Sequence, residues 1–180
     1  MFEAVAQPPP TGTAPEIKCG LMTPPPGAGG DPKVDALIDH ILSRYHATHR
    51  REFPEAIRLA RIVEAVHAAE VECPCGLGDH LAFMADDLES HQRREETVLF
   101  PMLRAGGSAL IRFPIGRMMA EHEDVEAQLV RLRVLTQDFT APPGACETWR
   151  ALVQACRKIA DDLTEHMRLE NEDLFERFLG

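Results

Sequence analysis

Two stretches of the chain place a histidine one helical turn before a glutamate. They are HQRREETVLFP, which begins at residue 91, and HMRLENEDLFE, which begins at residue 166. In both, a Leu-Phe pair follows eight and nine residues after the histidine. A spacing of four residues brings both side chains to one face of an α-helix, about 6 Å apart along its axis. Because imidazole and carboxylate together suit iron, manganese or zinc, the repeat predicts two matched halves of a metal site.

The elements that must position these residues are helices, separated by stretches rich in proline and glycine. Asp31-Pro32 is typical of a helix N-terminus, and Pro54 is expected to kink or restart this first helix near Phe53. Further helices are expected over about 78–104, 114–139 and 145–178, after the breaks CPCGLG, Gly106-Gly107 and TAPPGA. Four long amphipathic helices with short connections predict an all-α fold, an up-down-up-down four-helix bundle over residues 33–180.

Residues 1–32 differ in composition from the rest of the chain. They hold eight of the 14 prolines and five of the 12 glycines. Such a segment buries too little to offset its ordering entropy, so we expect a flexible arm. Cys19 is interpreted as an ordinary residue of this arm, with a reactive thiol as the alternative.

Charge and hydropathy exclude several classes of partner. The net charge is −10 with a pI near 5.2, whereas phosphate binding needs clustered Lys and Arg, so no nucleic-acid partner is expected. No apolar run approaches the roughly 20 residues of a membrane helix, and the N-terminus lacks the pattern of a secretory signal. Five sparse cysteines in such a chain indicate reduced thiols and a cytoplasmic protein.

Helical phase at 100° per residue points at least one histidine inward from each of the four helices. The inward stripes are expected to hold His46 and His49 near Leu42 and Phe53; His91 and Glu95 with Met84, Leu88, Val98 and Met102; His122 with Ile115, Met118, Met119, Val125, Leu129 and Leu132; and His166 and Glu170 with Leu152, Ile159, Leu163 and Leu174. Two buried carboxylates are costly without a cation, which favours a metal site over a purely hydrogen-bonded polar cluster. Four imidazoles and two carboxylates exceed the ligands of one tetrahedral zinc and suit a pair of metal ions.

Several stretches of the chain resemble the hemerythrin-like (HHE cation-binding) domain and, more narrowly, the di-iron iron-sulfur cluster repair family. They include RYHATHRREFPE, CPCGL, LESHQRREETVLFPML, PIGRMMAEHED and DDLTEHMRLENEDLF, in the family's order over about 35–179. The resemblance implies a non-heme di-iron centre, oxo- or hydroxo-bridged, held by four histidines and two bridging glutamates. Carried over by motif, the ligands are His46, His91, Glu95, His122, His166 and Glu170. His49 is the alternative to His46, since both fall on the inward side.

Four further residues are expected beside the ligands or along a channel to them. They are His49, His67, Asp87 and Glu121. Asp87 is one methylene shorter than the glutamate usual in the family. Full-length members of the repair family also carry a small domain with a cysteine motif ahead of the bundle, where this chain has only the Pro-rich arm and Cys19.

The resemblance implies a cytoplasmic non-heme di-iron protein of the nitrosative or oxidative stress response that aids repair of damaged iron-sulfur clusters. An alternative of a different class is a binding module that captures nitric oxide or dioxygen as a scavenger or sensor. A third is an enzyme that reduces nitric oxide at the two irons. The sequence does not decide among these, nor does it assign a role to Cys19, Cys73 or Cys75.

Overall fold

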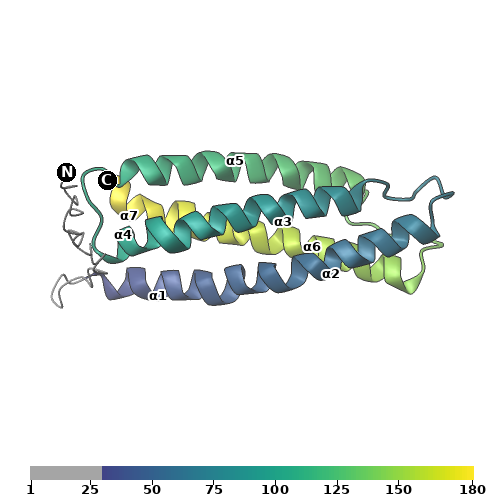
Figure 1. Cartoon of the computed structure of the whole chain (residues 1–180), viewed down its shortest axis with the longest axis horizontal. Helices are drawn as coiled ribbons and strands as arrows, with labels where there is room; N and C mark the ends of the chain where they lie inside the picture. The colour runs from purple at the N-terminus through teal and green to yellow at the C-terminus, as the bar shows by residue number, and fades with distance from the viewer. Residues whose placement is uncertain (1–29) are drawn as a thin grey trace, which may run out of the picture.

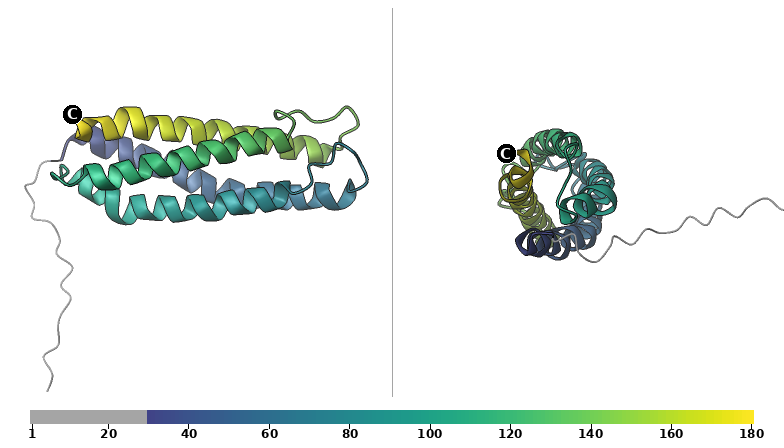
Figure 2. Two further views of the ribbon diagram at one scale, coloured as in Figure 1. Left: turned by 90° about the horizontal axis from the view of Figure 1, so that it is seen from above. Right: turned by 90° about the vertical axis from the view of Figure 1, so that its left-hand side faces the viewer.

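The structure, a computed structural model, describes residues 30–180. Four helical rods lie side by side and alternate in direction, and the start of the first rod and the C-terminus lie at the same end (Figure 1). Seen along the long axis, the rods surround a common centre (Figure 2). The predicted all-α four-helix bundle is therefore confirmed. The predicted arm over residues 1–32, with Cys19, lies outside the described residues except for its last three.

Three of the four rods are interrupted by a π-helical segment, labelled η. The first rod is α1 (Pro32–His40), η1 (Ile41–His46) and α2 (Ala47–Val66), and the second is α3 (Leu77–Arg94), η2 (Glu95–Leu99) and α4 (Phe100–Arg104). The third rod is α5 (Arg112–Leu135) alone, and the fourth is α6 (Glu147–Arg168), η3 (Leu169–Phe175) and α7 (Glu176–Leu179). A π turn holds one more residue than an α turn and occurs frequently at functional sites.

The first rod begins as predicted and runs without a break past Pro54. The Asp31 side chain accepts a hydrogen bond of 2.9 Å from the backbone N–H of Lys33, and Pro32 is the first helical residue. Of the kink or restart expected at Pro54, the restart is absent, because α2 runs through this proline. Phe53 and Ala56, on either side of it, are buried against the neighbouring rods, and this packing holds the helix together.

The third rod ends at Leu135, earlier than the expected Phe139. The backbone turns left-handed over residues 137–139, with φ between 49° and 56°. Thr136 supports this turn: its hydroxyl donates to the Leu132 carbonyl (2.7 Å) and accepts from the backbone N–H of Phe139 (3.2 Å). The turn buries the Phe139 side chain in the core. A helical extension would direct it elsewhere.

Two apolar clusters fill the bundle. The larger extends from Phe53 to Met167, and the smaller holds the Leu-Phe pairs Leu99-Phe100 and Leu174-Phe175. The inward positions of η2 differ from those expected, since Val98 is 51% exposed and Leu99 is 1% exposed. The extra residue of the π turn moves the inward face forward by one position. Met119, 37% exposed, lies at the edge of its stripe.

Within residues 30–180, no helix combines the length and apolar character that crossing a membrane requires. The four cysteines in this part, Cys73, Cys75, Cys146 and Cys156, are free.

Candidate metal centre

The centre lies where the three π segments and α5 face one another. His46 ends η1, Glu95 begins η2, and Glu170 is the second residue of η3. The remaining three histidines of the predicted set come from the α-helices: His91 from α3, His122 from α5 and His166 from α6. All six residues are buried, and none is more than 3% exposed.

The six residues form two groups of four that could each hold a metal ion. One group is His46, His166, Glu95 and Glu170, and the other is His91, His122, Glu95 and Glu170. Within each group the ligand atoms all lie within 4.8 Å of one another. The Nε2 atoms of the two histidines are 3.2 Å apart in the first group and 3.3 Å apart in the second.

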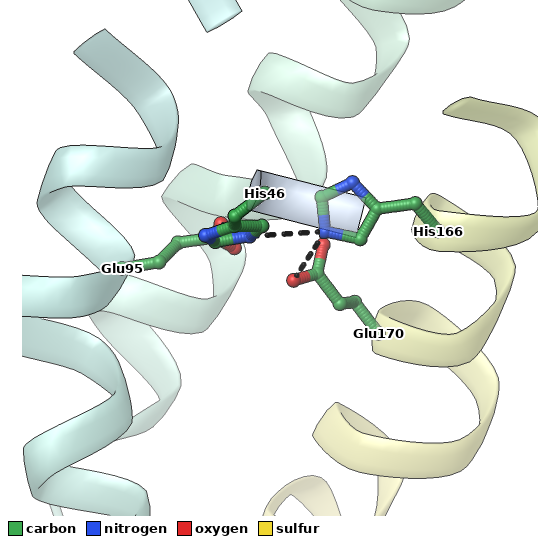
Figure 3. A group of neighbouring side chains, drawn as sticks. All are labelled: His46, Glu95, His166 and Glu170. Atoms are coloured by element: carbon green, nitrogen blue, oxygen red, sulfur yellow. Dashed lines mark hydrogen bonds and ion pairs between the residues drawn. The ribbon is translucent and has the colours of Figure 1, made fainter. Parts of the chain in front are cut away.

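Both glutamates belong to both groups, and each directs one oxygen to each group. Glu95 Oε2 lies 3.4 Å from Nε2 of His46, and Glu95 Oε1 lies 3.4 Å from Nε2 of His91. Glu170 Oε1 lies 3.0 Å from Nε2 of His166, and Glu170 Oε2 lies 3.2 Å from Nε2 of His122. Figure 3 shows the first group, in which side chains from three rods converge. A carboxylate placed in this way can bridge two cations.

Unpaired polar atoms in this cluster indicate that a cation belongs there. Both oxygens of Glu95 and Oε2 of Glu170 are buried without a hydrogen-bond partner. Most buried polar atoms in proteins are hydrogen-bonded, and an unpaired carboxylate is especially costly. A positive ion between the facing imidazole nitrogens and these oxygens would satisfy all of them, so the residues present fit a pair of metal ions.

The electrostatics of the protein groups lead to the same conclusion. Burial opposes protonation of His91, but the carboxylates of Glu95, Glu170 and Glu121 together outweigh it and raise the pKa of His91 to about 9. Burial also disfavours the charged form of Glu170, yet His166 and His122 hold the pKa of this carboxyl well below its ordinary value. The carboxylates therefore draw positive charge to the imidazoles, and metal ions would replace those protons.

Three of the four histidines have a hydrogen-bond partner on the ring nitrogen that faces away from the centre. Nδ1 of His46 bonds Glu96 (2.8 Å), Nδ1 of His91 bonds Glu121 (2.9 Å), and Nδ1 of His122 bonds the side-chain oxygen of Asn171 (2.8 Å). Such partners fix the tautomer and the ring orientation and leave Nε2 free for a metal.

Glu121 was predicted to lie beside the ligands, whereas Glu96 and Asn171 were not predicted. Each directly follows the glutamate of one copy of the repeat, but this position alone does not indicate which histidine it contacts. Glu121 also accepts hydrogen bonds from Arg94 (2.7 Å) and Arg117 (2.9 Å). Burial would raise the pKa of this carboxyl, but these bonds, together with the one from His91, lower it to about 2.

The structure places His49 beside the centre and not in it. Its ring lies 5.5 Å from that of His166, its Nδ1 bonds the side chain of Gln92 (3.0 Å), and its Nε2 has no partner. Burial, followed by the positive charge of His166 and His46, lowers the pKa of His49 to about 3. Of the two alternatives in the first rod, His46 is the one that the geometry brings to the carboxylates.

The contacts of the other two expected neighbours are to residues outside the two metal-binding groups. Asp87 accepts a hydrogen bond of 2.7 Å from Gln128 and so links α3 to α5. His67, expected beside the ligands or along a channel to them, follows the last residue of α2. Its ring contacts Trp149, its Nδ1 bonds Glu70 (2.7 Å), and its Nε2 lies 3.2 Å from Sγ of Cys146. It therefore joins two interhelical loops.

A comparison with known families agrees with this geometry. Residues 37–178 match the family model described as the hemerythrin HHE cation-binding domain. The chain belongs to this family. The matched region contains all six residues of the two groups, so the buried His and Glu cluster is a candidate cation site in a hemerythrin domain.

Three curated relatives carry the name iron-sulfur cluster repair protein YtfE. The relative from Dickeya chrysanthemi (strain Ech1591) is 46% identical over 143 residues, which are 79% of this hemerythrin-domain chain and 65% of the relative. That from Edwardsiella ictaluri (strain 93-146) is 42% identical over 147 residues, 82% of this chain and 66% of the relative. That from Yersinia pseudotuberculosis serotype IB (strain PB1/+) is 44% identical over 143 residues, with coverages of 79% and 65%. The chain thus spans slightly less than two thirds of the length of these relatives.

Proposed function

We propose that this hemerythrin-domain protein holds two iron ions and aids repair of damaged iron-sulfur clusters in the cytoplasm under nitrosative or oxidative stress. The observation that carries the proposal is the position of Glu95 and Glu170, each with one oxygen toward each pair of histidines. The names of the relatives support the cluster-repair part of the proposal.

The ligand set suits iron for a chemical reason. Mixed imidazole and carboxylate ligands accommodate iron, while thiolates, which select other metals, are absent from the two groups. Bound iron would supply one-electron redox chemistry and affinity for small ligands such as nitric oxide or dioxygen. The protein's own residues would hold the ions, through Nε2 of the four imidazoles and through the two carboxylates common to both groups. Glu96, Glu121 and Asn171 orient three of the rings.

The metal content tests the first part of the proposal. We expect about two irons per chain by elemental analysis, with Mössbauer and EPR spectra of a coupled pair. Removal of the metal should also lower the melting temperature, because buried carboxylates lose their counter-charge. One tightly bound zinc and no iron would contradict the di-iron centre.

A reconstitution experiment tests the second part. The iron-loaded protein is incubated anaerobically with an enzyme whose [4Fe–4S] cluster was damaged by nitric oxide, and recovery of that enzyme is measured. We expect recovery with the native protein and none with Glu170→Ala. Tight binding of nitric oxide without recovery would favour a scavenger or sensor, and nitrous oxide released over many turnovers would favour a nitric oxide reductase.

A further inference from the structure

The two halves of the centre are related by a local pseudo-twofold symmetry. The residue after each shared glutamate supports a histidine of another rod: Glu96 bonds Nδ1 of His46, and Asn171 bonds Nδ1 of His122, both at 2.8 Å. Two phenylalanine rings repeat the relation. Phe100 stacks on His46 with ring centroids 5.8 Å apart, and Phe175 stacks on His122 at 6.2 Å.

The symmetry breaks at the residues that precede His46 and His122. Glu121 precedes His122 and bonds Nδ1 of His91 at 2.9 Å. Tyr45 precedes His46 and instead lays its ring over His166, with centroids 5.3 Å apart and an interplanar angle of 6°. His91 is therefore oriented by a carboxylate, whereas Nδ1 of His166 is buried without a protein partner.

This difference makes the two metal positions unequal. A carboxylate on the outer ring nitrogen holds the imidazole in place and increases the basicity of the nitrogen that binds the metal. Loss of such a partner typically costs 10–100-fold in metal affinity, by order of magnitude. Since the pair His91 and His122 has two outer partners and the pair His46 and His166 has one, the second pair should bind its ion more weakly.

The surroundings of the two halves also favour weaker binding at the His46 and His166 position. On the His91 side, Glu121 is held between Arg94 and Arg117, whereas Glu96 on the other side is held by Arg50 alone. On the His166 side lies His49, whose Nε2 is buried and unpaired, as is Oε1 of Gln92. These two residues line a cavity of about 180 Å³ between α2 and α3.

The same cavity connects His49 with the molecular surface. Its lining also includes Arg50 and Glu89, whose side chains are 38% and 36% exposed. The His49 imidazole, which lies beside His166, and the Gln92 amide oxygen therefore stand between the His46 and His166 position and this cavity, and the cavity also has the Glu89 carboxylate, paired with Arg50 and Arg93, in its lining. Each of these is a ligand atom of a type that divalent metal ions accept.

We propose that the ion held by His46 and His166 is the exchangeable one, that the ion held by His91 and His122 stays in place, and that His49 is a transient ligand for the departing ion. The inference rests on the proposed two-metal centre and specifies which ion could serve as cargo.

Stepwise release of iron from the fully loaded protein tests this inference. Excess ferrozine is added to the reduced protein, and the iron removed is followed by absorbance and by elemental analysis of what remains. We expect two phases of equal amplitude, one ion each. Glu121→Gln should accelerate the slow phase by about 10–100-fold. Glu96→Gln, which changes the carboxylate that orients His46 in the other half, should accelerate only the fast phase.

His49→Ala should load two irons and release the first more slowly than the native protein. Glu126→Gln makes the same change of charge as Glu121→Gln and Glu96→Gln at an exposed position of α5. As their matched control, it should leave both phases of iron release unchanged. Thermal melts of each loaded variant show whether the fold is intact.

The possible outcomes separate this inference from the function on which it rests. Two ions that leave in one phase, or a Glu121→Gln variant that affects only the fast phase, would overturn the inequality of the two halves. An unchanged rate in His49→Ala would overturn the role of His49. A protein that loads only one ion would instead refute the two-metal centre itself.

Discussion

Glu95 and Glu170 face each other across the bundle axis from two different rods, and in residues 30–180 they are the two residues common to both metal-binding groups. Removing either carboxylate removes a ligand from both positions at once. Glu95→Ala and Glu170→Ala should therefore each reduce the metal content from about two ions per chain to less than one. Elemental analysis after gel filtration measures this, with the exposed Glu123→Ala as a control that keeps both ions. A variant that retains one firmly held ion would indicate a terminal ligand.

His46 and His49 lie one turn apart and are both buried, but only His46 reaches the carboxylates. His46→Ala should lose at least one metal ion per chain, whereas His49→Ala should keep two. Metal content together with the absorption spectrum distinguishes the two variants. The reverse result would make His49 the ligand of the first rod.

The π turn of η2 exchanges the positions of Val98 and Leu99 relative to a regular α-helix. Leu99→Ala should therefore cost about 2–5 kcal/mol of unfolding free energy, because it leaves a cavity in the smaller core cluster. Val98→Ala, at an exposed position, should stay within about 0.5 kcal/mol of the native protein. Urea denaturation measures both, and equal costs would argue against the shifted register.

Cys146 is exposed at the N-terminus of α6, where its thiol lies beside His67. Hydrogen bonds from the Trp149 backbone N–H and from His67 lower the pKa of Cys146, and Glu70, followed by Cys146, raises the pKa of His67. Because a lowered pKa keeps the thiolate present at lower pH, Cys146 should react with iodoacetamide faster at pH 7 than an ordinary thiol.

Peptide mass spectrometry of the alkylated protein measures this rate against pH. In His67→Gln the midpoint of the pH profile should move upward, and in Glu70→Gln, which keeps the imidazole, it should move less. The fluorescence of Trp149, the single tryptophan, gives a second measurement of the protonation of His67. Its ring lies 4.9 Å from that of His67, and a protonated imidazole quenches indole fluorescence. A profile that is the same in all three proteins would exclude the thiolate-imidazolium pair.

Much of this centre could be predicted from spacing alone. A separation of four residues brings His91 to Glu95 and His166 to Glu170 on any α-helix, and proline and glycine mark the breaks that define four rods. Both His46 and His49 fall on an inward face, so periodicity did not choose between them. The choice depends on η1, which changes the local phase of the first rod directly before His46.

The remaining features depend on contacts between rods. Glu96 and Asn171 are polar residues on helices, and only the packing of the neighbouring rod makes them partners of His46 and His122. The left-handed turn that buries Phe139 contains no glycine, so its residue types gave no sign of it. The π segments likewise lie at or beside ligand residues, and local helix propensity gives no sign of them.

The π segments also bear on how this centre could be moved to another protein. Copying six side chains onto a straight, designed four-helix bundle would reproduce their types and spacing but not their directions. On an uninterrupted α-helix, the residues after Glu95 would be rotated by about 100° relative to their present positions. Val98 would then take the place of Leu99 in the core. A transplanted centre therefore has to carry its three extra residues with it, and the number of residues in each rod matters as much as the identity of the ligands.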